Sequence, residues 1–245
     1  MDVRYSLRRT FPMTYEWLRG FKHPNQRRVE RDFRSRHGRG LYEATRRIHA
    51  NVESAHTQEE LLQVLDAILT GPDGLVVEAG CWKGASTAKI SLACRQAGKR
   101  LAVFDSFEGL PENDEPHETN IDGHEIHFHG GEYAGPLELV KDHVAKYGDL
   151  GVCSFHKGWF SDTMPGLREP VSVAYIDVDL VLSTADCLKA IYPLLVPGGV
   201  VFSQDGHVPL VVDLLNSDDF WEEEVGVSKP RMAGLGTDKL VRIFR

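Results

Sequence analysis

Residues 75–105 contain the pattern that most restricts the fold of this chain. The apolar run Leu75-Val-Val-Glu-Ala79 leads into Gly80 and Gly84, a helical stretch follows, and a second apolar run, Leu101-Ala-Val-Phe-Asp105, ends in an acid. Strand, glycine turn, helix and strand in this order predict a parallel βαβ unit. The glycines allow a tight turn close to a ligand, and a carboxylate at the end of the second strand can accept both hydroxyls of a ribose. The pattern therefore predicts a site for a nucleoside-containing cofactor.

The details of the turn indicate which cofactor this is. The glycines are spaced G-x-x-x-G, not in the G-x-G-x-x-G pattern of a dinucleotide fold. Glu78, in the first strand, would repel a pyrophosphate. A cationic ligand fits better, and S-adenosylmethionine carries a ribose together with an ammonium and a sulfonium group. We therefore expect S-adenosylmethionine at this turn.

Short apolar runs alternate with helical segments along the rest of the chain. Further strands are predicted at 152–155, 173–177, 200–203 and 239–244, and helices at 41–48, 57–69, 86–97 and 137–146, with another that starts at Ser183 and ends before Pro197. Continuous apolar strands separated by helices are typical of a parallel sheet covered on both faces. At 245 residues with 42% apolar content, the chain can bury one substantial core. We predict an α/β, Rossmann-like fold with ligands at the carboxyl ends of the strands.

Charge divides the chain into two regions. Residues 1–40 hold eleven Lys and Arg against four Asp and Glu, although the whole chain has a formal net charge of −8. This basic arm also contains aromatic residues such as Trp17 and Phe21. We therefore expect it to pack on the folded body, residues 41–245, or on a second subunit, giving a homo-oligomer such as a dimer. Nucleic-acid binding by the arm is the less favoured alternative.

Cysteine spacing and hydropathy bear on the cellular location. Cys81, Cys94, Cys153 and Cys187 form no C-x-x-C pair, as is usual in a reduced, cytoplasmic protein. The N-terminus lacks the apolar core of a secretion signal, and no run approaches the roughly 20 apolar residues that cross a bilayer. We expect a cytoplasmic protein that does not bind membranes.

Residues 108–135 interrupt the alternation of strands and helices. The segment is rich in proline, acids and histidines and is too long for a plain connection, which predicts an active-site lid. His127 and His129 would lie together on an extended chain, but no cysteine or second cluster completes a tetrahedral zinc site. We interpret them as solvated residues of the lid.

Acidic side chains follow two of the predicted strands. Asp177 and Asp179 end one strand, and residues two apart point to the same side of an extended chain. The next strand leads into Gln204 and Asp205, which add two oxygen ligands, with His207 close by. Oxygen ligands suit Mg²⁺ better than Zn²⁺. These four residues predict a magnesium site; the alternative is that the acids cap helices or turns.

An aromatic residue follows the third strand, in Lys157-Gly-Trp-Phe160. The planar ring of Trp159 could cover an adenine base. It could equally be a core residue.

Five segments together resemble one protein family. They are Val77-Glu-Ala-Gly-Cys-Trp-Lys-Gly84, Phe104-Asp-Ser-Phe-Glu-Gly-Leu-Pro111, Lys157-Gly-Trp-Phe160, Ile176-Asp-Val-Asp-Leu180 and Pro197-Gly-Gly199. From about Leu41 to the C-terminus the chain resembles the macrocin O-methyltransferase (TylF-like) family, whose members methylate sugar hydroxyls of natural products. The resemblance implies a class I methyltransferase domain with a mostly parallel seven-stranded sheet, S-adenosylmethionine as cofactor and a small-molecule hydroxyl acceptor.

The resemblance also implies roles for individual residues. Glu78, Gly80 and Ser86 would line the methionine end of S-adenosylmethionine, Asp105 and Ser106 would hold its ribose and adenine side, Gly158 and Trp159 would lie near the base, and Asp177 is also assigned to this site. Asp177, Asp179 and Asp205 match the metal ligands of the family. Gln204 replaces an acid and Val181 stands where a tyrosine is usual, so Mg²⁺ would meet one fewer negative charge, although an amide oxygen can still bind it.

The expected reaction is an in-line methyl transfer from the sulfonium to a substrate oxygen. Mg²⁺ would bind the hydroxyl and lower its pKa, and Asp179 or His207 would remove the proton. Two other functions stay open. One is a nucleotide-dependent oxidoreductase, against which stands the missing third glycine. The other is a non-catalytic, methyltransferase-like binding protein, for which Gln204 is the main support.

Overall fold

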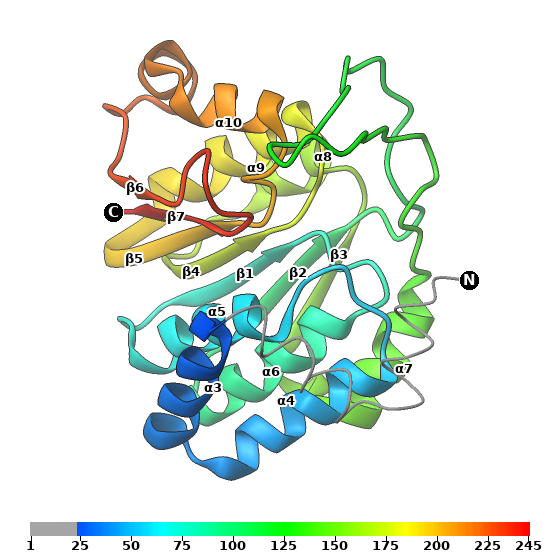
Figure 1. Ribbon diagram of the computed structural model, residues 1–245, viewed down its shortest axis with the longest axis vertical. Coiled ribbons are helices and arrows are strands. Elements are labelled where there is room, and N and C mark those ends of the chain that lie inside the picture. Colours follow the sequence, from blue (N-terminus) through cyan, green and yellow to red (C-terminus); the bar gives the residue numbers. More distant parts are fainter. Residues whose placement is uncertain (1–23) are drawn as a thin grey trace.

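A seven-stranded sheet forms the centre of the computed structural model, which describes residues 24–245 (Figure 1). The strands are β1 (Leu75–Ala79), β2 (Leu101–Asp105), β3 (Cys153–Lys157), β4 (Val171–Ile176), β5 (Leu195–Ser203), β6 (Met232–Ala233) and β7 (Val241–Phe244). Their order in the sheet is β3-β2-β1-β4-β5-β7-β6. Strands β1 to β5 are parallel, and β7 runs antiparallel to both β5 and β6. The predicted mostly parallel, seven-stranded sheet is confirmed.

Helices cover both faces of this sheet. They are α3 (Pro24–His37), α4 (Arg39–Asn51), α5 (Gln58–Thr70), α6 (Ala85–Ala97), α7 (Leu137–Tyr147), α8 (Phe160–Thr163), α9 (Val181–Ile191) and α10 (Pro209–Asn216), with a π-helical turn at Phe220–Val225. Figure 1 shows α3 to α7 on one face and α8 to α10 on the other. Among these helices, none combines the length and the apolar character that crossing a membrane requires.

The two faces of each central strand supply two separate cores. In β1, Val76 packs with the residues of α5 and α6, whereas Val77 packs with those of α9. Side chains alternate along a strand, so Glu78 points to the same face as Val76, toward α6. All five residues of β1 are buried. A carboxylate therefore lies inside the protein directly below the glycine turn.

Part of the predicted basic arm packs against α5. Phe33 of α3 is 1% exposed and belongs to the core on that side of the sheet. Arg36 and His37 contact the carboxylate of Asp66 in α5, at 2.7 and 2.6 Å. Residues 1–23, with the rest of the arm and its expected role in a dimer, lie outside the described residues.

Candidate functional site

A pocket lies at the carboxyl ends of β1, β2, β4 and β5, as the sequence predicts for this type of sheet. It brings together the glycine turn at Gly80, Asp105 at the end of β2, Asp177 and Asp179 after β4, and His207 after β5. Residues of the segment 108–135 and of the loop between α4 and α5 also line it. Residues from both predicted halves of the site, for the cofactor and for the metal, therefore line one cavity, whereas Glu78, Gly158, Gln204 and Asp205 are not among its lining residues.

Gly80 is required by the close approach of two chain segments. Its φ is +80°, and a Cβ at this position would lie 1.9 Å from the carbonyl oxygen of Asp177. The amide of Asp177 donates to the carbonyl of Ala79 at 2.9 Å, which joins the two strand ends. Gly84, with a φ of +79°, is the N-cap of α6, and Ser86 in the first turn of that helix lines the pocket. The first turn of α6 is thus directed at the cavity.

Glu78 is a buried acid directly below the glycine turn. Its side chain is fully buried, and neither carboxylate oxygen is hydrogen-bonded within residues 24–245. The hydroxyls of Ser86 and Thr87 lie close enough to favour its charged form, but burial dominates and raises the pKa of Glu78 to about 8. Burying a carboxyl group without a hydrogen-bonding partner lowers the stability of the folded protein unless a cation or a hydrogen-bond donor binds beside it. This position suits a cationic ligand group.

Asp105 is held rigidly by main-chain donors. Its Oδ2 accepts from the amide of Cys81 at 2.7 Å, and its Oδ1 accepts from the amide of Phe107 at 2.6 Å. The first bond ties the end of β2 to the glycine turn. Ser106 also lines the pocket, and its hydroxyl donates to the carbonyl of Gly109 at 2.7 Å. Burial raises the pKa of Asp105, although these amides oppose the shift.

Trp159 is a pocket residue and not a core residue. It is 39% exposed and lines the cavity just before α8 begins at Phe160. Gly158, with a φ of +148°, donates from its amide to the carbonyl of Asp105 at 3.0 Å. The core interpretation of Trp159 is therefore wrong. The indole stands beside the carboxylate expected to hold a ribose.

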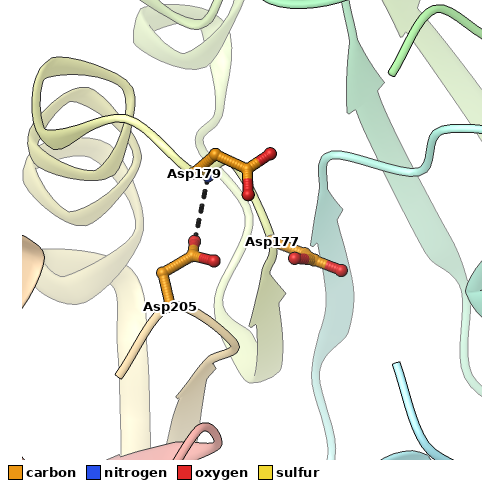
Figure 2. Close-up of side chains that lie close together, drawn as sticks. All are labelled: Asp177, Asp179 and Asp205. Atoms are coloured by element: carbon orange, nitrogen blue, oxygen red, sulfur yellow. Dashed lines mark hydrogen bonds between the residues drawn. The ribbon is translucent and has the colours of Figure 1, made fainter. Parts of the chain in front are cut away.

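Three carboxylates form a compact cluster on the other side of the pocket (Figure 2). Each of Asp177, Asp179 and Asp205 offers an oxygen within 4.8 Å of the others. Asp177 and Asp179 line the pocket, whereas Asp205 is 1% exposed. Burial and the neighbouring like charges raise the pKa of Asp177 to about 7 and that of Asp179 well above its usual range. The Oδ1 atom of Asp205 is buried without a hydrogen-bonding partner among the described residues. Such a cluster favours a bound cation.

The backbone conformation that brings these three acids together differs from the one predicted from the sequence. β4 ends at Ile176, and Asp179 has a φ of +62°, so the extended chain assumed for residues 177–179 is wrong. Oδ2 of Asp205 accepts from the amides of Val178 and Asp179 at 3.1 and 3.0 Å. A turn wrapped around Asp205, rather than strand alternation, brings the acids together.

Gln204 lies behind the cluster and is fully buried. Its Oε1 is 3.1 Å from the hydroxyl of Tyr175, which is also 3.1 Å from Oδ2 of Asp177. One hydroxyl proton can be donated to only one of these acceptors at a time. Tyr175 was missed in the sequence analysis, although its position two residues before Asp177 gave a signal. When the tyrosine hydroxyl donates to Gln204, it uses the oxygen that Gln204 would offer to a metal.

His207 lies at the edge of the cluster and lines the pocket. Burial, together with the positive charge of Lys239, lowers the pKa of His207 to about 4. Its imidazole is therefore neutral at pH 7. Lys239 also lines the pocket and was not predicted as a site residue, because the sequence pattern places it in the last strand, whereas β7 begins only at Val241. Its ammonium group favours the charged forms of the three acids.

Residues of the segment 108–135, the predicted lid, form part of the wall of the pocket. Phe128 and Tyr133 line the cavity from this segment. His127 and His129 are exposed, with their rings 6.4 Å apart, on the side opposite to Phe128. Alternation along the chain thus directs Phe128 inward and the histidines outward. Within the described residues, neither histidine belongs to a cluster of metal-ligating side chains.

Comparison with known proteins gives relatives that modify natural products. The chain is 34% identical over 171 residues to the 8-demethyl-8-(2,3-dimethoxy-alpha-L-rhamnosyl)-tetracenomycin-C 4'-O-methyltransferase of Streptomyces olivaceus, covering 65% of this chain and 62% of that protein. It is 31% identical to the mycinamicin III 3''-O-methyltransferase of Micromonospora griseorubida, covering 60% of each. The chain thus spans about three fifths of the length of these curated relatives.

Solved structures and a family model agree with this similarity. The O-methyltransferase NovP superposes with a TM-score of 0.61 and 26% identity, covering 78% of this chain and 83% of that one. The fold is that of class I S-adenosylmethionine-dependent methyltransferases. The model described as macrocin O-methyltransferase (TylF) matches residues 26–228, so the match begins fifteen residues before Leu41, where the resemblance was placed from the sequence. With most of its length matched, the chain belongs to the macrocin O-methyltransferase (TylF) family.

Proposed function

We propose that this protein is an S-adenosylmethionine-dependent O-methyltransferase that methylates a sugar hydroxyl of a natural product, assisted by a divalent cation. The observation that carries the proposal is the shared pocket: the glycine turn with Asp105 on one side and the three-carboxylate cluster on the other. A methyl donor and an ionised hydroxyl must meet in line at close range. A single cavity with one site for each partner meets that requirement.

The cofactor end of the pocket fits a cationic nucleoside. Glu78 is a buried carboxyl group with no hydrogen-bonding partner in residues 24–245, and an ammonium would compensate its charge. We assign Glu78, Gly80 and Ser86 to the methionine end. On the nucleoside side, Asp105 and Ser106 would hold the ribose and the adenine side, Gly158 and Trp159 would lie near the base, and Asp177 would border the cofactor. S-adenosylmethionine supplies a methyl group on a positively charged sulfur.

The acidic end of the pocket fits a hard divalent cation such as Mg²⁺. Asp177, Asp179 and Asp205 would hold it through carboxylate oxygens, of which Oδ1 of Asp205 is buried and unpaired. Gln204 would complete the set through its Oε1, with the hydroxyl of Tyr175 donating to Asp177 instead. A cation bound here would polarise the acceptor hydroxyl and lower its pKa.

Asp179 is the better candidate to accept the proton of the hydroxyl. It lines the pocket, and burial together with its like-charged neighbours raises its pKa well above its usual range, which makes it a stronger base than an ordinary aspartate. His207 is neutral at pH 7 and so has a free lone pair, but a pKa of about 4 makes it a weak base. We therefore assign proton removal to Asp179 and orientation of the acceptor to His207.

The sugar acceptor is inferred from the family and from its relatives. The two curated relatives are named for methylation at the 4' and 3'' oxygens of glycosylated natural products. The aromatic residues Phe128, Tyr133 and Trp159 line the same pocket and offer flat apolar surfaces to a ring. A dimer formed through the N-terminal arm stays part of the proposal.

Calorimetric titration with S-adenosylmethionine, in EDTA and then in excess Mg²⁺, tests the proposal, with NAD as the control ligand. We expect binding of S-adenosylmethionine but not of NAD, and methyl transfer to a glycoside that depends on the cation. Asp179→Asn should lower kcat at least about 100-fold while changing cofactor affinity less than about threefold. Tight NAD binding would favour an oxidoreductase. Cofactor binding without transfer to any of a panel of glycosides would favour a non-catalytic protein.

A further inference from the structure

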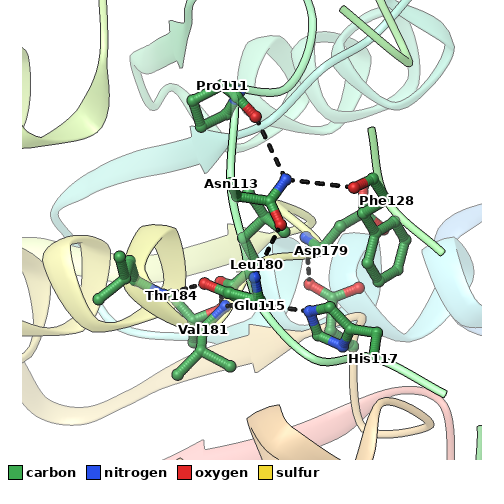
Figure 3. A network of polar contacts seen from close by, with 11 residues as sticks. Pro111, Asn113, Glu115, His117, Phe128, Asp179, Leu180, Val181 and Thr184 are labelled. Atoms are coloured by element: carbon green, nitrogen blue, oxygen red, sulfur yellow. Dashed lines mark hydrogen bonds and ion pairs between the residues drawn. The ribbon is translucent and has the colours of Figure 1, made fainter. Parts of the chain in front are cut away.

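Glu115, in the lid, is bonded to the first turn of α9. Its Oε2 accepts from the amide of Val181 at 2.8 Å, and its Oε1 accepts from the amide of Leu182 at 3.1 Å (Figure 3). The first amides of a helix have no partner within the helix itself. The N-cap residue of α9 is Leu180, whose side chain has no atom that can accept a hydrogen bond. The lid therefore supplies the cap that the sequence of α9 lacks.

Glu115 is itself fixed within the lid. Nε2 of His117 lies 2.8 Å from Oε2 of Glu115, and the two side chains are 2% and 12% exposed. The ring of Phe128 meets His117 edge to face, with centroids 4.9 Å apart. The amide group of Asn113 donates to the carbonyls of Pro111 and Phe128 at 3.3 and 3.2 Å. Figure 3 shows this network between two segments of the lid and the start of α9. Glu115 is thus tied to both segments of the lid through His117 and Asn113.

The turn that carries Asp179 is held from its other side by Asp205. Oδ2 of Asp205 accepts from the amides of Val178 and Asp179, and the amide of Leu180 donates to the carbonyl of Val178 at 2.6 Å. Asp179 has a φ of +62°, a conformation that is unfavourable for a residue other than glycine and persists only when its surroundings enforce it. Asp205 accepts from the amides of Val178 and Asp179, before Leu180. Glu115 accepts from the amides of Val181 and Leu182, after it. Two carboxylates therefore clamp the turn on either side of Asp179.

We propose that Glu115 is a positioning residue that couples closure of the lid to the placement of Asp179. The proposal rests on the proposed function, in which Asp179 accepts the proton. Glu115 acts through the backbone of α9, since both of its oxygens are bonded to main-chain amides. A second contact joins the lid to the site: the amide of Ile121 donates to the carbonyl of His207 at 3.0 Å. With the lid closed over an acceptor, the carboxylate is held for reaction; with the lid open, the turn loses one of its two clamps.

The chemistry at this contact requires a carboxylate with both oxygens free to accept. A negative charge at a helix N-terminus is also favoured by the helix dipole. Glutamine would keep one acceptor oxygen but would place an NH₂ group against the other amide. Alanine would remove both acceptors. Glu115→Gln should therefore have an intermediate effect and Glu115→Ala the full one.

Hydrogen–deuterium exchange of the full-length protein, followed by mass spectrometry of its peptides, measures this coupling without any turnover. We expect Glu115→Ala to raise exchange about tenfold both in the lid and in residues 178–184, in line with the loss of a helix cap. Glu118→Ala, which removes an exposed acid from the same lid, is the matched control and should leave both segments unchanged. If Glu115→Ala does not fold, Glu115→Gln provides the same comparison.

Kinetics with an acceptor glycoside that the wild type methylates then separate a positioning role from a structural one. Glu115→Ala should lower kcat about tenfold or more while the Kd for S-adenosylmethionine changes less than about threefold. Faster exchange in the lid with unchanged exchange in residues 178–184, or the same result with Glu118→Ala, would overturn the coupling. Unchanged kcat would overturn the positioning role alone. If the wild type binds no S-adenosylmethionine and transfers no methyl group, the proposed function fails, and the catalytic part of this inference fails with it. The exchange result would still show whether Glu115 holds the turn at residues 178–184.

Discussion

Replacing Glu78 with glutamine should make the ligand-free protein more stable at neutral pH. Glu78 is fully buried in β1, neither of its oxygens has a hydrogen-bonding partner among the described residues, and burial raises its pKa from 4.5 to about 8. The folded protein therefore keeps this carboxyl group protonated at pH 7, whereas the unfolded chain releases the proton. Glutamine has nearly the same shape and is neutral in both states.

The size of the effect follows from the two pKa values. Below pH 4.5 the carboxyl group of Glu78 is protonated in both the folded and the unfolded protein, so its contribution to the free energy of unfolding is fully present. Between pH 4.5 and about 8 only the folded state holds the proton, so the free energy of unfolding of the wild type falls by about 1.4 kcal/mol per pH unit. The difference in favour of Glu78→Gln should therefore grow to about 3 kcal/mol at pH 7 and level off near 5 kcal/mol above pH 8. Any cost of burying the amide adds a constant and does not change this slope.

Urea unfolding of both proteins at pH 5, 6, 7 and 8, without cofactor or metal, measures the slope directly. Glu118→Gln removes the same charge from the exposed lid and corrects for effects of net charge. Calorimetry of Glu78→Gln should also show weaker binding of S-adenosylmethionine, because the charge proposed to face its ammonium is gone. A stability difference that stays flat from pH 5 to pH 7.5 would refute the reasoning, since Glu78 would then not be a buried, uncharged acid.

The remaining predictions concern the glycine turn and the acidic cluster. Gly80→Ala should destabilise the protein by more than about 2 kcal/mol in urea unfolding, because the added methyl group would lie 1.9 Å from a carbonyl oxygen. Gly98 also has a positive φ, +68°, but a Cβ there would have nothing within 4 Å, so Gly98→Ala should destabilise the protein by only about 1 kcal/mol. Excess Mg²⁺ should raise the melting temperature more at pH 8 than at pH 6, because the carboxyl group of Asp177, with a pKa of about 7, must lose its proton to bind a cation. Asp205→Asn should abolish that difference, and an equal increase in the variant would contradict the assignment of the cluster.

The fold could be predicted because its determinants are local. Buried strands such as β1 and β2 are short, continuously apolar runs, and the glycines between them admit one kind of turn. The position of the site followed from the same pattern, since parallel strands all end at one edge of the sheet. Asp105, Asp177 and Asp205 were therefore expected in one place before any contact was known.

The contacts that hold the site together could not be predicted in the same way. Glu115 binds an amide 66 positions along the chain, from a segment with no periodic pattern. The positive φ of Asp179 depends on amides being accepted by Asp205 and Glu115, so it is a consequence of the tertiary structure. The start of α9 shows the result: Ser183 looked like the natural beginning of the helix, but the lid caps it at Val181 instead.

The distribution of charge explains why the pocket and its ligands must be considered together. Buried acids lie on both sides of it, Glu78 below the glycine turn and the aspartate cluster opposite, and burial raises the pKa values of all of them. Such an arrangement lowers the stability of the ligand-free protein, so it is favoured only if cations occupy it in the working state. Asp177 belongs to both halves, because its backbone contacts Ala79 and Gly80 while its carboxylate joins the cluster. A cationic methyl donor and a metal-bound hydroxyl would therefore be placed by one rigid junction between two neighbouring strands, which is the condition for an in-line transfer.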